Sequence, residues 1–125
     1  MTGDILVVDD DESIREVMEM ILADKGYRVR VAADGAEALQ QLRDGAAPDV
    51  ILLDLMMPGM DGWTFHDALI HDPTLARIPV VAMSGDGRIQ HKAASMGVTT
   101  HLAKPIDLDD LLRLVARFTE SPAAD

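Results

Sequence analysis

The sequence predicts an α/β domain with a doubly wound (βα)5 arrangement, in which a parallel five-stranded sheet lies between two layers of helices. Two observations lead to this prediction. Short apolar runs of strand length alternate five times with segments whose apolar residues recur at helical spacing. The chain has 125 residues, of which 48% are hydrophobic, and this suits one domain with one substantial core. Strands that are joined by short helical crossovers lie parallel, with helices on both faces of the sheet.

Five segments are expected to be strands. In chain order they are Ile5–Val8, Tyr27–Val31, Val50–Leu53, Pro79–Met83 and Thr99–Ala103. The first, third and fourth are almost entirely apolar, as strands that are buried on both faces are, whereas the fifth is the weakest signal. The second alternates between apolar residues and Arg28 and Arg30, which predicts one polar face and a position near the sheet edge.

Five amphipathic segments are expected to be helices. Their apolar positions are Ile14, Val17, Met18, Ile21 and Leu22; Ala36, Leu39 and Leu42; Phe65 and Leu69; Ile89, Ala93 and Met96; and Leu108, Leu111, Leu112 and Val115. Gly26 is placed to end the first helix, and Asp61 is placed to cap the third. His66, His71 and His91 lack the paired spacing of metal ligands, and we expect them to be exposed on helices.

The composition excludes several classes of function. Without cysteine, the chain cannot form a disulfide framework, a thiolate zinc site or a thiol nucleophile. A net charge of −11 argues against direct binding to nucleic acid or to an anionic membrane, because both attract basic surfaces. No apolar run approaches the ~20 residues that cross a bilayer, and Met1–Asp4 lacks the basic start of a signal peptide. We therefore expect a soluble, cytoplasmic domain over residues 1–120, without membrane insertion, and a short disordered tail at 121–125.

Polar and charged side chains follow the predicted strands at the points where the strands end. These residues are Asp9, Asp10 and Asp11 after the first strand, Asp54 after the third, Ser84 after the fourth and Lys104 after the fifth. In open parallel sheets, binding sites form beyond these strand ends. If the first and third strands are neighbours, several carboxylates converge in one crevice, where their mutual repulsion requires a cation. Oxygen ligands favour Mg²⁺, and Lys104 and Ser84 would then donate to the oxygens of a phosphoryl group. Asp11 is equally well placed to cap the following helix.

Four motifs at these strand ends resemble those of the response-regulator receiver domain, the phosphoacceptor module of two-component signalling. They are Asp9–Asp10, Leu53–Gly62 with the sequence LDLMMPGMDG, Met83–Gly85 and Lys104–Pro105. The resemblance covers essentially the whole chain and is to single-domain receivers of the chemotaxis-regulator type. It implies a flavodoxin-like sheet with strand order 2-1-3-4-5, and a cis peptide bond between Lys104 and Pro105.

The resemblance also implies a set of Mg²⁺ ligands around the phosphorylated residue, which would be Asp54. Asp10 and Asp54 would bind the ion through their carboxylates. Asp9 would bind it mainly through water, and Met56 would contribute its backbone carbonyl. Mg²⁺ is therefore the expected cofactor.

Further residues would contact the phosphoryl group or change conformation when it is added. By resemblance, Lys104 would pair with the phosphoryl group and Ser84 would reach toward it as a switch residue. Receivers often carry Tyr or Phe three residues before this lysine, and the ring turns inward on activation, but here the residue is His101. We hypothesise that His101 shares in the switch and makes partner binding sensitive to pH near neutrality, whereas a solvent-facing histidine would do neither. Met56 and Asp86 stand at positions that tune phosphoryl lifetime in the family.

By resemblance, the chain is a signalling switch rather than an enzyme that acts on other substrates. A sensor histidine kinase or a histidine phosphotransfer protein would donate a phosphoryl group to Asp54 in a Mg²⁺-dependent reaction, and hydrolysis would remove it. The added charge would change the binding of a downstream protein through the face of the fourth helix, fifth strand and fifth helix. The chain would catalyse only its own phosphorylation and dephosphorylation.

Two other functions fit parts of the sequence. A receiver-like adaptor would bind partners without being phosphorylated. The run Asp9–Ser13 loosely resembles the start of haloacid-dehalogenase-type phosphatases, in which Asp9 would be the nucleophile and Asp11 the acid–base, but this assignment leaves Asp54 without a role. A stand-alone regulator and a receiver within a larger protein both fit the sequence.

Overall fold

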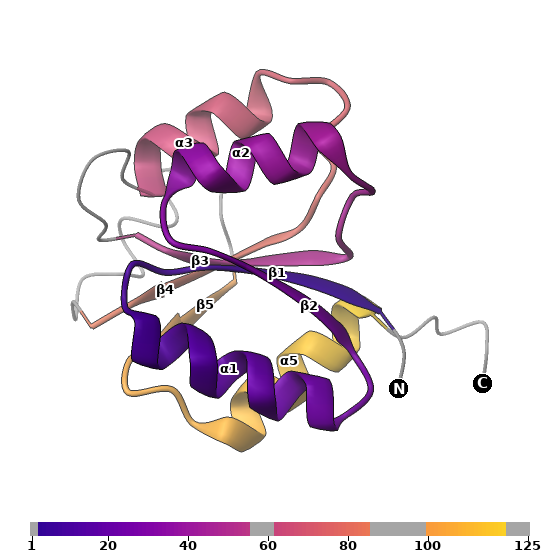
Figure 1. The fold of residues 1–125 in the computed structure, drawn as a ribbon. Helices are drawn as coiled ribbons and strands as arrows, with labels where there is room; N and C mark the ends of the chain where they lie inside the picture. The colour runs from indigo at the N-terminus through magenta and orange to yellow at the C-terminus, as the bar shows by residue number, and fades with distance from the viewer. Residues whose placement is uncertain (1–2, 56–61, 86–99, 120–125) are drawn as a thin grey trace.

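The computed structural model describes residues 3–55, 62–85 and 100–119, which form a parallel sheet between two layers of helices (Figure 1). The described helices and strands alternate as far as the fourth strand, as the apolar patterns predict. In order they are β1 (Asp4–Val8), α1 (Glu12–Asp24), β2 (Arg28–Ala32), α2 (Gly35–Asp44), β3 (Val50–Asp54), α3 (Gly62–Ile70), β4 (Val80–Ser84), β5 (His101–Ala103) and α5 (Leu108–Thr119). The strand bounds differ from the predicted ones by only one or two residues.

All five strands are parallel and lie in the order β2-β1-β3-β4-β5, which confirms the order that the resemblance implies. The chain moves outward from β1 to β2 and then returns to β3 on the other side of β1. Sites in such sheets form at this switch point, between the ends of β1 and β3. Val8 pairs with Leu53 in the register of these two strands, so the next residues, Asp9 and Asp54, lie at the same level where the strands end.

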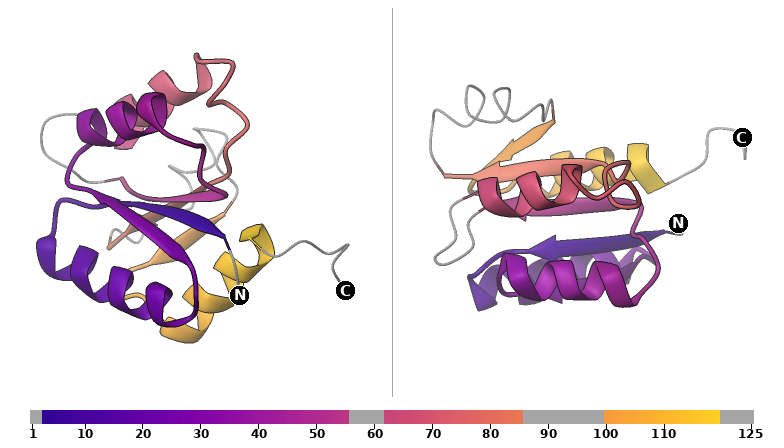
Figure 2. Two further views of the ribbon diagram at one scale, coloured as in Figure 1. Left: turned by 45° about the vertical axis from the view of Figure 1, so that its right-hand side comes forward. Right: turned by 90° about the horizontal axis from the view of Figure 1, so that it is seen from above.

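The central strands serve two hydrophobic cores, because their side chains alternate between the two faces of the sheet. In β1, Leu6 and Val8 face the core under α2 and α3, whereas Ile5 and Val7 face the core under α1 and α5. Figures 1 and 2 show these helix pairs on opposite sides of the sheet. Burial on both sides explains why the sequence of a central strand is continuously apolar.

The edge strand and the helix ends follow their sequence signals. β2 lies at one edge of the sheet, as its alternation of apolar residues with arginines predicts. The carboxylate of Asp11 accepts hydrogen bonds from the backbone N–H of Ser13, at 2.9 Å, and of Ile14, at 3.3 Å. Asp11 is therefore the N-cap of α1. Gly26, with φ of 95°, follows the end of this helix in a conformation that favours glycine.

Four predictions of burial or exposure were wrong. Ala36 and Leu108, assigned to the apolar faces of α2 and α5, are exposed at the first turns of these helices. Val17, assigned to the apolar face of α1, is 46% exposed, because α1 and α5 leave a groove between them rather than meeting along their length. His66, expected to be exposed, is only 8% exposed. It follows the fully buried Phe65, about 100° further around α3, so α3 is covered on more than the side that faces the sheet.

Some expected features lie outside the described residues. They are the fourth helix with Ile89, Ala93 and Met96, the cap at Asp61, the backbone carbonyl of Met56, Asp86, His91 and the tail at 121–125. Among the residues that are described, no helix combines the length and the apolar character needed to span a bilayer.

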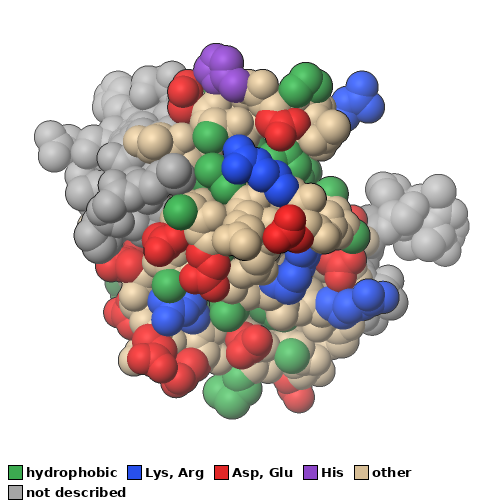
Figure 3. All heavy atoms as spheres, turned by 45° about the horizontal axis from the view of Figure 1, so that its top comes forward, with side chains coloured by type: hydrophobic (Ala, Val, Ile, Leu, Met, Phe, Trp, Pro, Cys, Tyr) green, Lys and Arg blue, Asp and Glu red, His purple; other side chains and the backbone are tan. Residues whose placement is uncertain are grey.

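Charged side chains of both signs share the surface. Figure 3 shows the molecule with the α2–α3 layer turned toward the viewer, and on this face acidic side chains lie among the lysines and arginines. This distribution agrees with the net charge of −11, and this face offers no continuous basic surface to a phosphate backbone.

Candidate functional site

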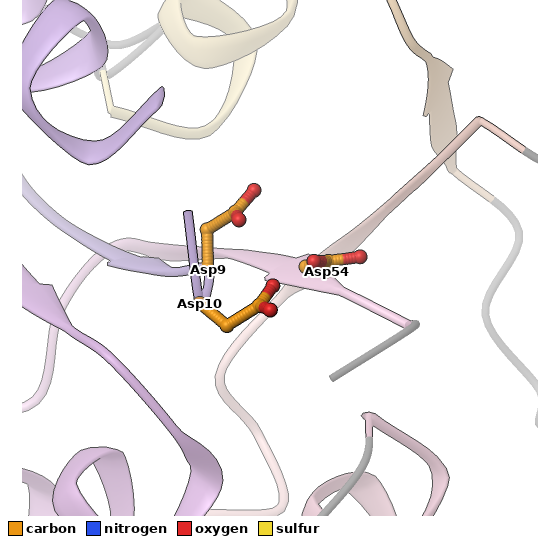
Figure 4. Close-up of side chains that lie close together, drawn as sticks. All are labelled: Asp9, Asp10 and Asp54. Atoms are coloured by element: carbon orange, nitrogen blue, oxygen red, sulfur yellow. The ribbon is translucent and has the colours of Figure 1, made fainter. Parts of the chain in front are cut away.

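Three carboxylates meet beyond the ends of β1 and β3, and we call Asp9, Asp10 and Asp54 the acidic cluster (Figure 4). One oxygen of each lies within 4.8 Å of the others. Asp9 and Asp54 are buried, whereas Asp10 is exposed, and its carboxylate points toward Asp54 in Figure 4. The structure thus brings together three aspartates that the sequence places in two separate segments.

Lys104 supplies a positive charge to this acidic cluster. Its Nζ lies 2.8 Å from Oδ2 of Asp9 and 3.5 Å from Oδ2 of Asp54, and its side chain is 20% exposed. Burial alone would lower the pKa of Lys104, but the hydrogen bond to Asp9 and the charges of Asp54 and Asp9 outweigh this effect and raise the pKa. Lys104 therefore remains a cation at neutral pH.

Within the described residues, four hydrogen bonds hold Asp9. Its backbone N–H donates to the carbonyl of Ala32 at 3.1 Å, and its backbone carbonyl accepts from Nη1 of Arg15 at 2.8 Å. Its Oδ1 accepts from the N–H of Asp11 at 2.9 Å, and its Oδ2 accepts from Lys104. These hydrogen bonds fix both the backbone and the carboxylate of Asp9. Arg15 was not predicted from the sequence, because its only signal there is its position one turn into the helix that follows the aspartates.

The ends of β4 and β5 bring Ser84 and Lys104 next to each other. Ser84 is the last residue of β4, is buried, and pairs in register with Ala103. Its backbone carbonyl accepts a hydrogen bond from the N–H of Lys104 at 3.0 Å. The Lys104–Pro105 peptide bond is cis, as the resemblance implies. The Ser84 hydroxyl therefore leaves the same edge of the sheet as the lysine.

His101 lies away from this edge. It is the first residue of β5, is half-buried, and pairs with Ala82. Lys104 follows it three positions later, which corresponds to about 10 Å along a strand. Any part that His101 plays in switching would therefore involve the rest of β5 rather than direct contact with the acidic cluster.

The donor set suits Mg²⁺. The acidic cluster offers carboxylate oxygens, the hard ligands that Mg²⁺ prefers, and the sequence contains no thiolate. Mg²⁺ usually retains several water molecules, and the exposed side of Asp10 gives them access. The residues present therefore fit this ion.

The comparisons with known proteins agree with this geometry. The family model of the response regulator receiver domain matches residues 5–116. This chain belongs to the response-regulator receiver family. Receiver domains are signalling switches that interact with histidine kinases and downstream effectors, and they bind Mg²⁺ in an acidic pocket.

Individual receiver-containing proteins are also similar to this chain. Response regulator PleD of Caulobacter vibrioides is 47% identical over 112 residues, which cover 86% of this chain and 24% of that protein. The DNA-binding dual master transcriptional regulator RpaA of Synechocystis is 38% identical over 113 residues, covering 89% of this chain and 46% of that protein. This receiver domain thus spans half or less of the length of these two relatives. The solved structure of the chemotaxis protein CheY4 of Vibrio cholerae has a TM-score of 0.85 at 32% identity and covers 94% of this chain and 99% of that one.

Membership in the receiver family argues against the alternative that the chain is a haloacid-dehalogenase-type phosphatase. A haloacid-dehalogenase-type mechanism would use Asp11 as the acid–base, but the carboxylate of Asp11 caps α1. Its Oδ1 is the oxygen that accepts both backbone N–H groups. Both observations argue against Asp9 as a phosphatase nucleophile.

An apolar groove lies beside the site, between α1 and the segment that leads from β5 into α5. Its volume is about 300 Å³. The residues that line it are Ser13, Ile14, Val17, Met18, Ile21, Lys104, Pro105, Ile106, Leu108 and Leu111. Val17 and Leu108, which are 46% and 48% exposed, form part of it. Because Lys104 both lines this groove and contacts the acidic cluster, a protein seated in the groove would lie next to the site.

Proposed function

We propose that this receiver domain accepts a phosphoryl group on Asp54 from a phosphohistidine of a sensor histidine kinase or a histidine phosphotransfer protein. The observation that carries the proposal is the buried carboxylate of Asp54, which lies within 4.8 Å of two other carboxylates and 3.5 Å from a lysine ammonium. A carboxylate in this setting is a nucleophile surrounded by groups that can bind the oxygens of its electrophile.

The proposed transfer forms one bond and breaks one. An oxygen of Asp54 attacks phosphorus, the P–N bond of the phosphohistidine breaks, and the imidazole leaves with the electron pair and takes up a proton. The product is an aspartyl phosphate. In the second half of the cycle, which is hydrolysis, water attacks phosphorus, inorganic phosphate leaves, and the carboxylate of Asp54 is restored.

Two donors are placed to bind the phosphoryl oxygens. The ammonium of Lys104 needs only a small movement from its present 3.5 Å separation from Asp54 to pair with an oxygen attached there. The hydroxyl of Ser84 would donate a second hydrogen bond from the neighbouring strand end. Asp9 would keep Lys104 oriented, because its Oδ2 already accepts a hydrogen bond from the ammonium.

Mg²⁺ would be held by Asp10 and Asp54 directly and by Asp9 mainly through water. Met56, outside the described residues, would contribute its backbone carbonyl. When bound, the ion would neutralise charge that builds on the phosphoryl oxygens during transfer. Among the three carboxylates, that of Asp10 is best placed to bind the ion, since it is exposed and turned toward Asp54.

Phosphorylation would act as a switch through differential contacts. The phosphoryl group adds negative charge and acceptor oxygens, which would be new partners for Lys104 and Ser84. The change would pass along β5 and α5, together with the expected fourth helix, to a downstream protein. His101 lies on this path, and we keep the hypothesis that it shares in the switch.

The apolar groove beside α1 supports docking of the protein that carries the phosphohistidine. A donor must bring its imidazole to Asp54 at the edge of the sheet, and the groove lies against Lys104 at that edge. Its lining offers apolar area for association with that protein. The adaptor alternative is less well supported, because the described residues already include the nucleophile, the lysine and the hydroxyl that phosphorylation needs.

The proposal is tested by incubating the chain with MgCl₂ and acetyl phosphate and measuring its intact mass. The parent should gain the mass of one phosphoryl group, and this gain should disappear when EDTA replaces MgCl₂. Asp54→Asn should gain none, whereas Asp44→Asn, a matched change at an exposed site on α2, should behave like the parent. A parent chain that stays unmodified by acetyl phosphate and by a panel of phosphorylated histidine kinases would favour the adaptor function instead.

A further inference from the structure

We infer that Arg15 is a positioning residue for the acidic cluster: it holds the peptide group between Asp9 and Asp10 and so directs the carboxylate of Asp10 toward Asp54. The inference rests on the proposed function, because it concerns how the same cluster is made ready for Mg²⁺. Arg15 itself touches neither Asp10 nor Asp54 in any described hydrogen bond, so it acts through the backbone.

The contact that carries the inference is a hydrogen bond from Nη1 of Arg15 to the backbone carbonyl of Asp9, 2.8 Å long and partly buried. That carbonyl belongs to the peptide group that continues to the nitrogen of Asp10. Because a peptide group is planar, fixing its oxygen also fixes the orientation of the next N–H and the position of the next Cα. The direction in which the Asp10 side chain leaves the backbone is thereby restricted.

Asp10 needs such a restraint more than its neighbours do. Asp9 and Asp54 are buried, at 0% and 3% exposure, whereas Asp10 is exposed. Asp9 is also fixed by Lys104 and by the N–H of Asp11. Within the described parts of the chain, no hydrogen bond or ion pair holds the carboxylate of Asp10. Its direction must therefore come from the backbone on which it stands.

Arg15 and the loop form a closed unit with the start of α1. Asp11 caps the helix with its carboxylate, and its carbonyl accepts the N–H of Arg15 at 3.0 Å in the first helical turn. The side chain of Arg15 then returns to the carbonyl of Asp9, two residues before the cap. A hydrogen bond from a guanidinium is charge-assisted, and the planar fork of arginine loses less freedom on binding than a lysine side chain does.

A purely electrostatic role for Arg15 predicts the opposite result. A positive charge close to the acidic cluster repels Mg²⁺, so removing that charge alone should strengthen Mg²⁺ binding. Removing a residue that positions Asp10 should weaken it. The sign of the change in affinity therefore distinguishes positioning from simple charge.

The test is a titration of the chain with MgCl₂, followed by the backbone amide signals in two-dimensional NMR spectra. Arg15→Gln should raise the Kd for Mg²⁺ by about tenfold, the scale on which groups behind the direct ligands affect metal affinity. Arg15→Lys should fall between this variant and the parent, because a lysine restores the charge and one donor. Arg113→Gln, the same change at an exposed arginine on α5, should bind Mg²⁺ like the parent.

The spectra without Mg²⁺ establish that each variant is folded, so a lost fold is not mistaken for lost affinity. Parent-like or tighter binding by Arg15→Gln would overturn the inference. Should that variant fail to fold, parent-like binding by Arg15→Lys would overturn it in the same way. A parent chain that binds no Mg²⁺ would instead contradict the proposed function, so the two failures are distinguishable.

Discussion

Replacing Asp10 by asparagine is expected to have effects of opposite sign with and without Mg²⁺. The substitution removes one negative charge from a cluster in which one oxygen of each of three carboxylates lies within 4.8 Å of the others. Without the ion, Asp9 and Asp54 both repel that charge and the single ammonium of Lys104 attracts it, so repulsion dominates and the variant should be more stable than the parent. With the ion, Asp10 is a proposed ligand, so the variant should lose most of the stabilisation that binding provides.

The magnitude follows from the geometry and the exposure of Asp10. At 4.8 Å, two unit charges repel by about 0.9 kcal/mol in the dielectric of water, the appropriate limit for an exposed carboxylate, so two such pairs amount to about 1.7 kcal/mol. Mg²⁺ at a hundredfold excess over its Kd stabilises the parent by about 2.7 kcal/mol. Because Lys104 offsets part of this repulsion, the two stabilities should become equal by the time Mg²⁺ reaches about 17 times the Kd, provided that the variant binds little of the ion.

The assay is urea unfolding followed by circular dichroism over a series of MgCl₂ concentrations, with CaCl₂ as a comparison ion. Glu16→Gln, the same loss of charge at an exposed position on α1, is the matched control and should show no crossing of the stability curves. An Asp10→Asn variant that is less stable than the parent without Mg²⁺, or that gains as much from Mg²⁺ as the parent, would refute this reasoning.

Three further predictions concern the lysine, a buried histidine and the groove. Lys104→Met should lower the free energy of unfolding by about 3 kcal/mol in urea, because it leaves a buried carboxylate without its counter-ion; an unchanged midpoint would contradict this. Burial lowers the pKa of His66, so the unfolded chain binds more protons than the folded chain as pH falls below about 6.5, and the free energy of unfolding should decline there. His66→Gln should remove this decline. His71→Gln, a change at an exposed histidine, should keep it. Val17→Glu should slow phosphotransfer from a histidine kinase that phosphorylates the parent but not from acetyl phosphate, whereas Met20→Glu, also exposed on α1 but outside the groove, should slow neither.

The order of the elements could be predicted from the sequence because it depends on local patterns. A strand that is buried on both faces must be apolar throughout, and Val50–Leu53 shows this directly. The arginines of β2 likewise indicate an edge strand. The order of the strands in the sheet does not follow from such patterns, because periodicity describes one segment at a time. Here it came from the resemblance to receivers, and the pairing of β1 with both β2 and β3 confirms it.

The composition of the site could be predicted, but its internal contacts could not. The position of Asp9, Asp54 and Lys104 at strand ends was enough to predict that they meet. That Lys104 donates to Asp9 at 2.8 Å and lies farther from Asp54 depends on the path of the loops. The hydrogen bond from Arg15 to a backbone carbonyl leaves no pattern in the sequence, since carbonyls are present at every residue. The burial of His66 was missed for a related reason: it depends on the packing around α3, which helical spacing alone does not reveal.

The central claim is that Asp54 carries the phosphoryl group, and the most direct test is to identify the modified residue. After phosphorylation in the presence of Mg²⁺, reduction with borohydride converts an acyl phosphate into a stable alcohol, which peptide mass spectrometry can locate. The account predicts a homoserine at position 54 and none at positions 9, 10 or 11. Modification of Asp9 instead, with Asp54 unchanged, would contradict it.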